Sequence, residues 1–190
     1  MPSRPYLNTL HAVSASSANP AQLALLDQAR QQVGFIPNMY ANMVNEPAVL
    51  STYLHGYSLF RQQSGLSPAE QEVIFLAISR ANGCDYCTAA HSMIADKVSK
   101  VPPVTLAKIR QGQVIPDARL AAVHALATEM VSTQGRPTAT TLQAFLDAGF
   151  EERHVLQIIL AVAVKTLSNF SNHAFATTLD DRFAAHAMPK

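Results

Sequence analysis

The chain has 190 residues, of which 48% are hydrophobic and 14% are charged, and its formal net charge is +1. This length is sufficient for one sizeable core, and without a cluster of Lys and Arg a nucleic-acid partner is not expected. The longest apolar run, 155–164, is too short to span a bilayer, and the N-terminal segment has no continuous apolar stretch typical of a signal peptide. We therefore expect a soluble, cytoplasmic protein without a membrane partner.

The low charge fraction also predicts how the chain assembles. An average soluble domain has about 25% charged residues, so a monomer with this composition would expose a large apolar area. Part of that area is expected to be buried between copies of the chain, which predicts a homo-oligomer.

The spacing of apolar residues indicates an all-α protein. Residues 1–20 are rich in Ser, Ala, Asn and Pro and predict an extended N-terminal arm, followed by a single all-α domain over residues 21–190. In that domain apolar residues recur at helical spacing, and prolines stand where helices begin. Helices are predicted over 21–33, 38–45, 48–63, 68–81, 84–100, 103–111, 117–132, 138–148 and 151–190, the last with a break near Ser168. The predicted architecture is a set of packed helix hairpins.

A weak internal repeat is visible in the sequence. EQEVIFLAISRANGCDYCTAAH aligns with ERHVLQIILAVAVKTLSNFSNH, 82 residues later. In the second copy, Glu72, Cys84 and Cys87 are replaced by His154, Thr166 and Asn169. A true duplication and a chance match between two amphipathic segments both account for this similarity.

Four residues form a motif whose side chains could carry out chemistry. Cys84 and Cys87 are the two cysteines of the chain, and His91 follows four residues after the second. A helix turning about 100° per residue places these three side chains in one narrow stripe. Glu72 would lie about 18 Å from Cys84 on an uninterrupted helix, but the Asn-Gly dipeptide at 82–83 is a helix-stop signal. If the chain turns back there, the spacing predicts a contact between Glu72 and His91.

The same turn would place both cysteines in the first turn of a new helix. Unpaired N–H groups and the positive end of the helix dipole stabilise a thiolate at that position. A carboxylate–imidazole pair can accept a thiol proton and return it to a leaving group, and a neighbouring thiol can convert a sulfenic acid into a disulfide. The motif therefore favours redox chemistry by Cys84 and Cys87, with Glu72 and His91 as the proton relay.

Structural readings of these residues remain alternatives. Free cysteines are often buried as small apolar residues, and a lone histidine is more often a core or surface residue than a catalyst. A zinc site would have three ligands in Cys84, Cys87 and His91 but no obvious fourth, so no metal is predicted. The combination of spacing, helix stop and upstream carboxylate favours the redox interpretation.

Together these residues resemble a known family. Glu72-x11-Cys84-x2-Cys87-x3-His91 is similar to the signature of the alkylhydroperoxidase AhpD-like family, within the carboxymuconolactone decarboxylase superfamily. The stretch from GFIPNMYANM through the motif, about residues 34–100, resembles its peroxidase-related branch. The resemblance implies an all-α fold, thiol-dependent reduction of hydroperoxides and assembly into trimers or hexamers. One position departs from the family pattern, because Tyr86 stands where well-studied members have a second histidine.

The predicted function is a cysteine-dependent peroxidase that cycles between dithiol and disulfide without metal, haem, flavin or another cofactor. Cys87, one helical turn from His91, is the predicted site of peroxide attack and Cys84 the resolving cysteine, although the reverse assignment is open. The family resemblance implies a dithiol reductant, either a lipoyl-bearing or a thioredoxin-like protein. Two alternatives are a decarboxylase or lactone-processing enzyme of the superfamily, and a non-enzymatic redox sensor or scaffold.

Further polar and aromatic residues on the predicted helices could line a substrate pocket. Tyr86, His55 and Tyr57 are predicted to bind substrate. A second set, Asn169, Asn172 and His173, falls on one helical face, and a third, Met39, Tyr40 and Met43, lies near the start of the domain. We expect a structural role for both of these sets, in the core or at a subunit boundary.

Overall fold

The computed structural model describes residues 4–189, and the regular elements of this part of the chain are all helices, with no strand. The all-α prediction is therefore confirmed. The helices are α1 (Pro20–Val33), α2 (Asn38–Met43), α3 (Pro47–Gln63), α4 (Pro68–Ala81), α5 (Asp85–Lys97), α6 (Pro103–Gln111), α7 (Ala118–Ser132), α8 (Ala139–Asp147), α9 (Glu152–Phe175) and a 3-10 helix, η1 (Asp181–His186).

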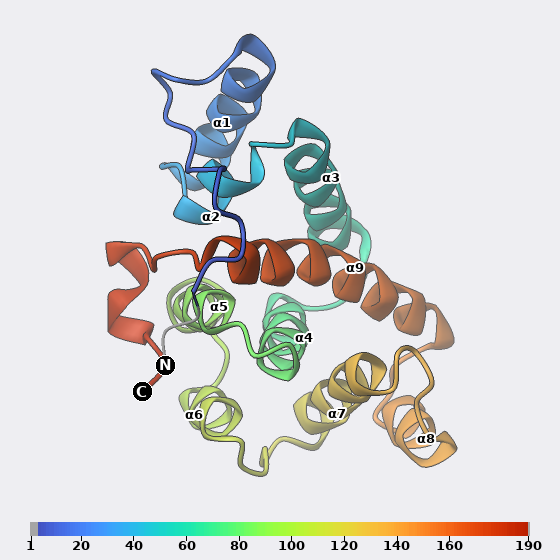
Figure 1. Cartoon of the computed structure of the whole chain (residues 1–190). Helices are drawn as coiled ribbons and strands as arrows, with labels where there is room; N and C mark the ends of the chain where they lie inside the picture. The colour runs from blue at the N-terminus through green and yellow to red at the C-terminus, as the bar shows by residue number, and fades with distance from the viewer. Residues whose placement is uncertain (1–3, 190) are drawn as a thin grey trace.

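The long helix α9 runs through the middle of the molecule, with α1–α3 on one side and α4–α8 on the other (Figure 1). It contacts α2, α3, α4, α5 and α7. By length and composition α9 could span a membrane, and 39% of its most apolar stretch is buried inside the protein. A polar side chain on its inner face therefore lies near the centre of the protein.

Buried apolar side chains form two clusters around α9. One is built mainly from α4, α6, α7 and α8. The other is built from α1–α3, the start of α5 and Phe183, and it includes Cys84 and Cys87. The two predicted redox cysteines consequently lie within the second cluster.

Helices α4 and α5 form the predicted hairpin. Ser67 caps α4 in a capping box with Glu70, and Pro68 occupies the first turn. At the other end the chain reverses at Gly83, whose φ of 66° belongs to the left-handed region that glycine tolerates. Cys84 then becomes the N-cap of α5, and its amide donates to the carbonyl of Ser79 at 2.9 Å.

Two details of the C-terminal half differ from expectation. Helix α9 continues without a break through Ser168, because the Ser168 hydroxyl donates to the Lys165 carbonyl of its own helix at 3.1 Å and does not interrupt the backbone pattern. The helix ends at Phe175, before Ala176 with a φ of 46°, and not at the C-terminus. The second segment of the proposed repeat is thus one straight helix, whereas the first is a hairpin.

The segment before α1 is non-helical over residues 4–19, in line with an extended arm, and residues 1–3 of the predicted arm lie outside the described part. The amides of Tyr6 and Leu7 both donate to the Ala174 carbonyl near the end of α9. Helix α1 begins at Pro20, at the predicted boundary.

Candidate active site

The predicted contact between Glu72 and His91 is present. Glu72 Oε2 and His91 Nδ1 are 2.8 Å apart across the α4–α5 hairpin. Glu72 is 0% exposed and His91 is 4% exposed, so this pair is shielded from water. With the carboxylate ionised, Nδ1 of the neutral imidazole donates this hydrogen bond and Nε2 is an acceptor.

The Glu72 carboxylate also contacts a basic residue that the motif does not predict. The guanidinium of Arg61 on α3 donates to Glu72 Oε1, and it also donates to the hydroxyl of Tyr57 at 2.7 Å. Burial raises the pKa of Glu72, but the His91 and Arg61 contacts more than offset this and hold the pKa below its ordinary value. Glu72 is therefore a stable anion inside the core.

A second basic residue, Lys165 on α9, was also missed. Its Nζ lies 2.9 Å from His91 Nε2, and its side chain is 0% exposed. Burial and the charge of Lys165 lower the pKa of His91, against the raising effect of Glu72. A signal for Lys165 existed in the sequence, since it is a lone charge directly after the apolar run 155–164.

The two thiols lie next to the same face of α9. The Cys87 sulfur is 3.8 Å from the Ser168 hydroxyl and 3.3 Å from the side-chain nitrogen of Asn172, and that nitrogen is 3.7 Å from the Cys84 sulfur. Positions 165, 168 and 172 follow the helical repeat and share one side of α9. A single stripe of α9 thus brings the Ser168 hydroxyl and the Asn172 amide to the thiols and Lys165 to His91.

The surroundings shift the pKa values of the two cysteines in opposite directions. Burial raises the pKa of Cys87, but the hydrogen bond from Cys84, the charges of Lys165 and His91, and Ser168 bring the pKa well below the ordinary thiol value. The hydrogen bond to Cys87, followed by burial, raises the pKa of Cys84. These opposite shifts in pKa favour ionisation of Cys87 over ionisation of Cys84. Both cysteines are free, and they are 2% and 1% exposed.

The three predicted substrate-binding residues lie in different places. Tyr57 is beside the relay through its bond to Arg61. Tyr86 is buried and donates its hydroxyl to Asp180 near η1, which also accepts the Asn38 amide. His55 is on the exposed side of α3 and has no hydrogen bond to the relay or the thiols. Their role in substrate binding stays a prediction, and position favours Tyr57.

The other two residue sets divide between core packing and contact with the thiols. Asn169 accepts a hydrogen bond from Asn82 at 2.9 Å, whereas Asn172 reaches the thiols. The Asn172 nitrogen also lies 3.3 Å from the Met39 sulfur. Met39, Tyr40 and Met43 are buried in the cluster that contains the cysteines, so the expectation of core packing holds for them. Among residues 4–189, no group of three His, Cys, Asp or Glu side chains is arranged to hold a metal ion.

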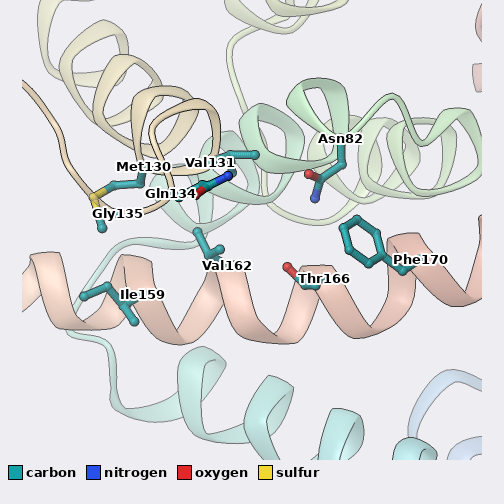
Figure 2. A pocket seen from close by; sticks show the side chains of 9 residues that line it. All are labelled: Asn82, Met130, Val131, Gln134, Gly135, Ile159, Val162, Thr166 and Phe170. Atoms are coloured by element: carbon teal, nitrogen blue, oxygen red, sulfur yellow. The ribbon is translucent and has the colours of Figure 1, made fainter.

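A pocket of about 350 Å³ lies elsewhere, between α7 and another face of α9 (Figure 2). Ile159, Val162 and Thr166 of α9 face Met130 and Val131 of α7 across it. None of the four motif residues lines it, and its lining is mainly apolar. We therefore assign the chemistry to the thiol site and not to this pocket.

Comparison with known families agrees with the motif. The model of the carboxymuconolactone decarboxylase family matches residues 47–128, which contain Glu72, Cys84, Cys87 and His91. Over this segment the chain is similar to the carboxymuconolactone decarboxylase family. No significant match was found among curated protein sequences.

Solved structures share the fold of this chain over almost its whole length. An uncharacterized peroxidase-related protein from Ralstonia eutropha JMP134, described as an alkylhydroperoxidase AhpD core, has a TM-score of 0.78 and 21% identity, covering 95% of this chain and 96% of that chain. A peroxidase-related protein from Silicibacter sp. TM1040 has a TM-score of 0.75 and 20% identity, with 94% and 96% covered. The debrominase Bmp8 in complex with 2,3,4-tribromopyrrole has a TM-score of 0.75 and 16% identity, with 96% and 97% covered.

Proposed function

We propose that this protein is a thiol-dependent peroxidase that reduces hydroperoxides through a Cys84–Cys87 dithiol/disulfide cycle. The observation that carries the proposal is the unequal state of the two thiols. The Asn172 amide donates to the Cys87 sulfur at 3.3 Å. Burial raises the pKa of Cys87, but the hydrogen bond with Cys84 and the charges of Lys165 and His91 lower it overall, whereas the contact with Cys87 and burial raise the pKa of Cys84. A thiolate beside a protonated second thiol is the arrangement that two-electron reduction followed by disulfide formation requires.

The chemistry proceeds in two steps. The Cys87 thiolate attacks the terminal oxygen of a hydroperoxide, so that an S–O bond forms, the O–O bond breaks and an alkoxide leaves. The alkoxide takes up a proton from the buried relay that includes Glu72 and His91. Cys84 then loses its proton and attacks the Cys87 sulfenic acid, which forms the disulfide and releases the hydroxyl group as water. The sulfurs supply two electrons, and ROOH becomes ROH and H2O.

A dithiol reductant must return the disulfide to its starting state. We propose a lipoyl-bearing or thioredoxin-like protein, because a second thiol on the donor can resolve the mixed disulfide formed by the first. Free thiols that must be regenerated suit the reducing cytoplasm, which is the proposed location. We also propose a homo-oligomer, a trimer or hexamer, in which the exposed apolar side chains of α9 are covered.

The test is a single-turnover reaction of the reduced protein with tert-butyl hydroperoxide, followed by turnover with dihydrolipoamide. Peroxide loss should match disulfide formation one to one. Cys87→Ser should abolish the reaction, and Cys84→Ser should allow one oxidation to a sulfenic acid without turnover. No peroxide consumption with any dithiol reductant, or full activity in Cys87→Ser, would reject the peroxidase.

The same assay separates other functions. Bromide release from 2,3,4-tribromopyrrole, faster than any peroxide reduction, would indicate that the dithiol reduces a carbon–bromine bond instead. Turnover of a carboxymuconolactone that survives replacement of both cysteines would favour a decarboxylase or lactone-processing enzyme. A change of oligomer size on oxidation without turnover would favour a redox sensor.

A further inference from the structure

Both ring nitrogens of the His91 imidazole have hydrogen-bond partners, so neither is available to contact a thiol. Its Nδ1 is 2.8 Å from Glu72, and its Nε2 is 2.9 Å from Lys165 Nζ. A proton that passes between His91 and the reacting atoms must therefore cross Lys165 or break one of these two hydrogen bonds. The amino group of Lys165 forms the other end of this row of hydrogen-bonded groups, and its α9 neighbours Ser168 and Asn172 contact the Cys87 sulfur.

The charges of the buried groups also connect Lys165 with Cys87. A fully buried ammonium is costly unless an anion offsets it. Glu72 already accepts hydrogen bonds from both Arg61 and His91. The Cys87 thiolate remains as the anion for Lys165, and the four charges of Arg61, Lys165, Glu72 and Cys87 then sum to zero. When Cys87 is oxidised, its negative charge disappears and Lys165 loses its counter-ion.

We propose that Lys165 is the proton donor to the leaving oxygen of the peroxide, with Glu72 and His91 holding its amino group in place. This inference rests on the proposed peroxidase function. It assigns the proton to an amino group that is hydrogen-bonded to the imidazole and whose charge acts on both thiols, and it gives a role to a lysine buried in the centre of the protein.

The protons balance in this scheme. As the Cys87 thiolate takes the terminal oxygen, the Lys165 ammonium gives a proton to the departing alkoxide and becomes a neutral amine. The amine next removes the proton of Cys84, whose thiolate attacks the Cys87 sulfenic acid. The hydroxide that leaves takes that proton and forms water. The products are ROH, H2O, the disulfide and a neutral Lys165, with no proton drawn from solvent.

The decisive experiment compares two oxidants that differ in leaving group. An alkoxide from tert-butyl hydroperoxide needs a proton as it leaves, whereas the acetate from peracetic acid does not. In the Lys165→Met variant the single-turnover rate should fall by about 10²–10⁴-fold with tert-butyl hydroperoxide, the range of general acid catalysis, and by at least ten times less with peracetic acid. Lys97→Met, which changes an exposed lysine of α5, is the matched control and should leave both rates unchanged.

Each outcome decides one question. An equal loss with both oxidants would mean that Lys165 acts only through charge or packing, and the inference would be wrong while the peroxidase remained. A protein without reaction toward either oxidant would reject the proposed function itself. Circular dichroism and thermal unfolding of both variants verify that the fold is retained.

A measurement on the unchanged protein covers the case in which Lys165→Met does not fold. The reduced protein, at a pH where alkylation shows Cys87 to be a thiolate, is mixed with tert-butyl hydroperoxide in weak buffer with a pH indicator. If Lys165 supplies the proton, no proton is taken up in the kinetic phase of oxidation. Uptake of one proton per disulfide in that phase would show that solvent is the donor and would overturn the proposal.

Discussion

Asn172 donates its side-chain amide to the Cys87 sulfur at 3.3 Å, although the two residues are 85 positions apart in the chain. The amide oxygen of Asn172 has no hydrogen-bond partner, so the side chain is held by what its nitrogen contacts. Nitrogen donors directed at a sulfur favour the thiolate, because they stabilise negative charge more than a neutral thiol. This contact ties the long helix α9 to the chemistry of the motif on α5.

Replacement of Asn172 should raise the pKa of the Cys87 thiol. For Asn172→Leu, which removes the donor and keeps the approximate volume, we expect the midpoint of alkylation by iodoacetamide to rise by about one pH unit, equivalent to ~1.4 kcal/mol. Asn169→Leu is the control on the same helix, because Asn169 binds Asn82 instead. Equal midpoints in the wild type and Asn172→Leu would contradict a role for this donor.

The two cysteines should differ in reactivity once they are separated. Cys84→Ser leaves Cys87 beside Lys165, Ser168 and Asn172, so its thiol should still alkylate with a midpoint below the ordinary value of about 8.5. Cys87→Ser leaves Cys84 without the Cys87 contact, the largest cause of its raised pKa, but still buried. Its thiol should alkylate more slowly at pH 7. The reverse order would assign the peroxide-reactive sulfur to Cys84.

Removal of the Glu72 carboxylate should destabilise the fold as well as the reaction. Glu72→Gln leaves Arg61 without its buried partner, and breaking such a pair costs about 3–5 kcal/mol. Thermal or urea unfolding measures this loss. A double replacement, Arg61→Met with Glu72→Met, should cost less than the sum of the single changes, since no charge is left unpaired. Additive effects would show that the two side chains do not interact.

Stability should fall as the pH is lowered from 7. Burial is the main cause of a lowered pKa for His91, His124 and His154, so the unfolded chain binds more protons than the native protein below about pH 6.5. Burial raises the pKa of Glu72, but His91 and Arg61 lower it overall. Protonation of Glu72 therefore also reduces stability as the pH falls below about 4.5. Each group with a lowered pKa reduces the free energy of unfolding by up to about 1.4 kcal/mol per pH unit, between its pKa in the unfolded chain and its pKa in the folded protein. A midpoint of thermal unfolding that is constant from pH 7 to pH 5 would disagree.

The outer face of α9 should be covered in solution. Leu156, Ile159 and Phe170 are 67%, 47% and 53% exposed in the single chain. We expect light scattering to show a homo-oligomer, and Leu156→Lys with Phe170→Lys to shift it toward the 20.5 kDa monomer. A monomer at micromolar concentration in the unchanged protein would disprove this assembly.

The helical elements and the local geometry of the motif could be predicted from the sequence. Prolines, capping residues and Gly83 act over a few positions, so the helix starts, the α4–α5 hairpin and the Glu72–His91 contact follow from spacing alone. The break expected near Ser168 was wrong, because a serine that bonds to its own helix carbonyl does not stop a helix that is packed on several sides.

The surroundings of the thiols depend on how distant helices pack against the motif, and the sequence of the motif does not predict them. Arg61, Lys165 and Asn172 come from α3 and α9, and nothing in the motif's own spacing specifies which faces of those helices meet it. Their placement depends on how the two apolar clusters pack on either side of α9, which is a property of the whole core. This packing places the buried Lys165 Nζ 2.9 Å from His91 Nε2, a contact between residues 74 positions apart that the spacing of the motif does not predict.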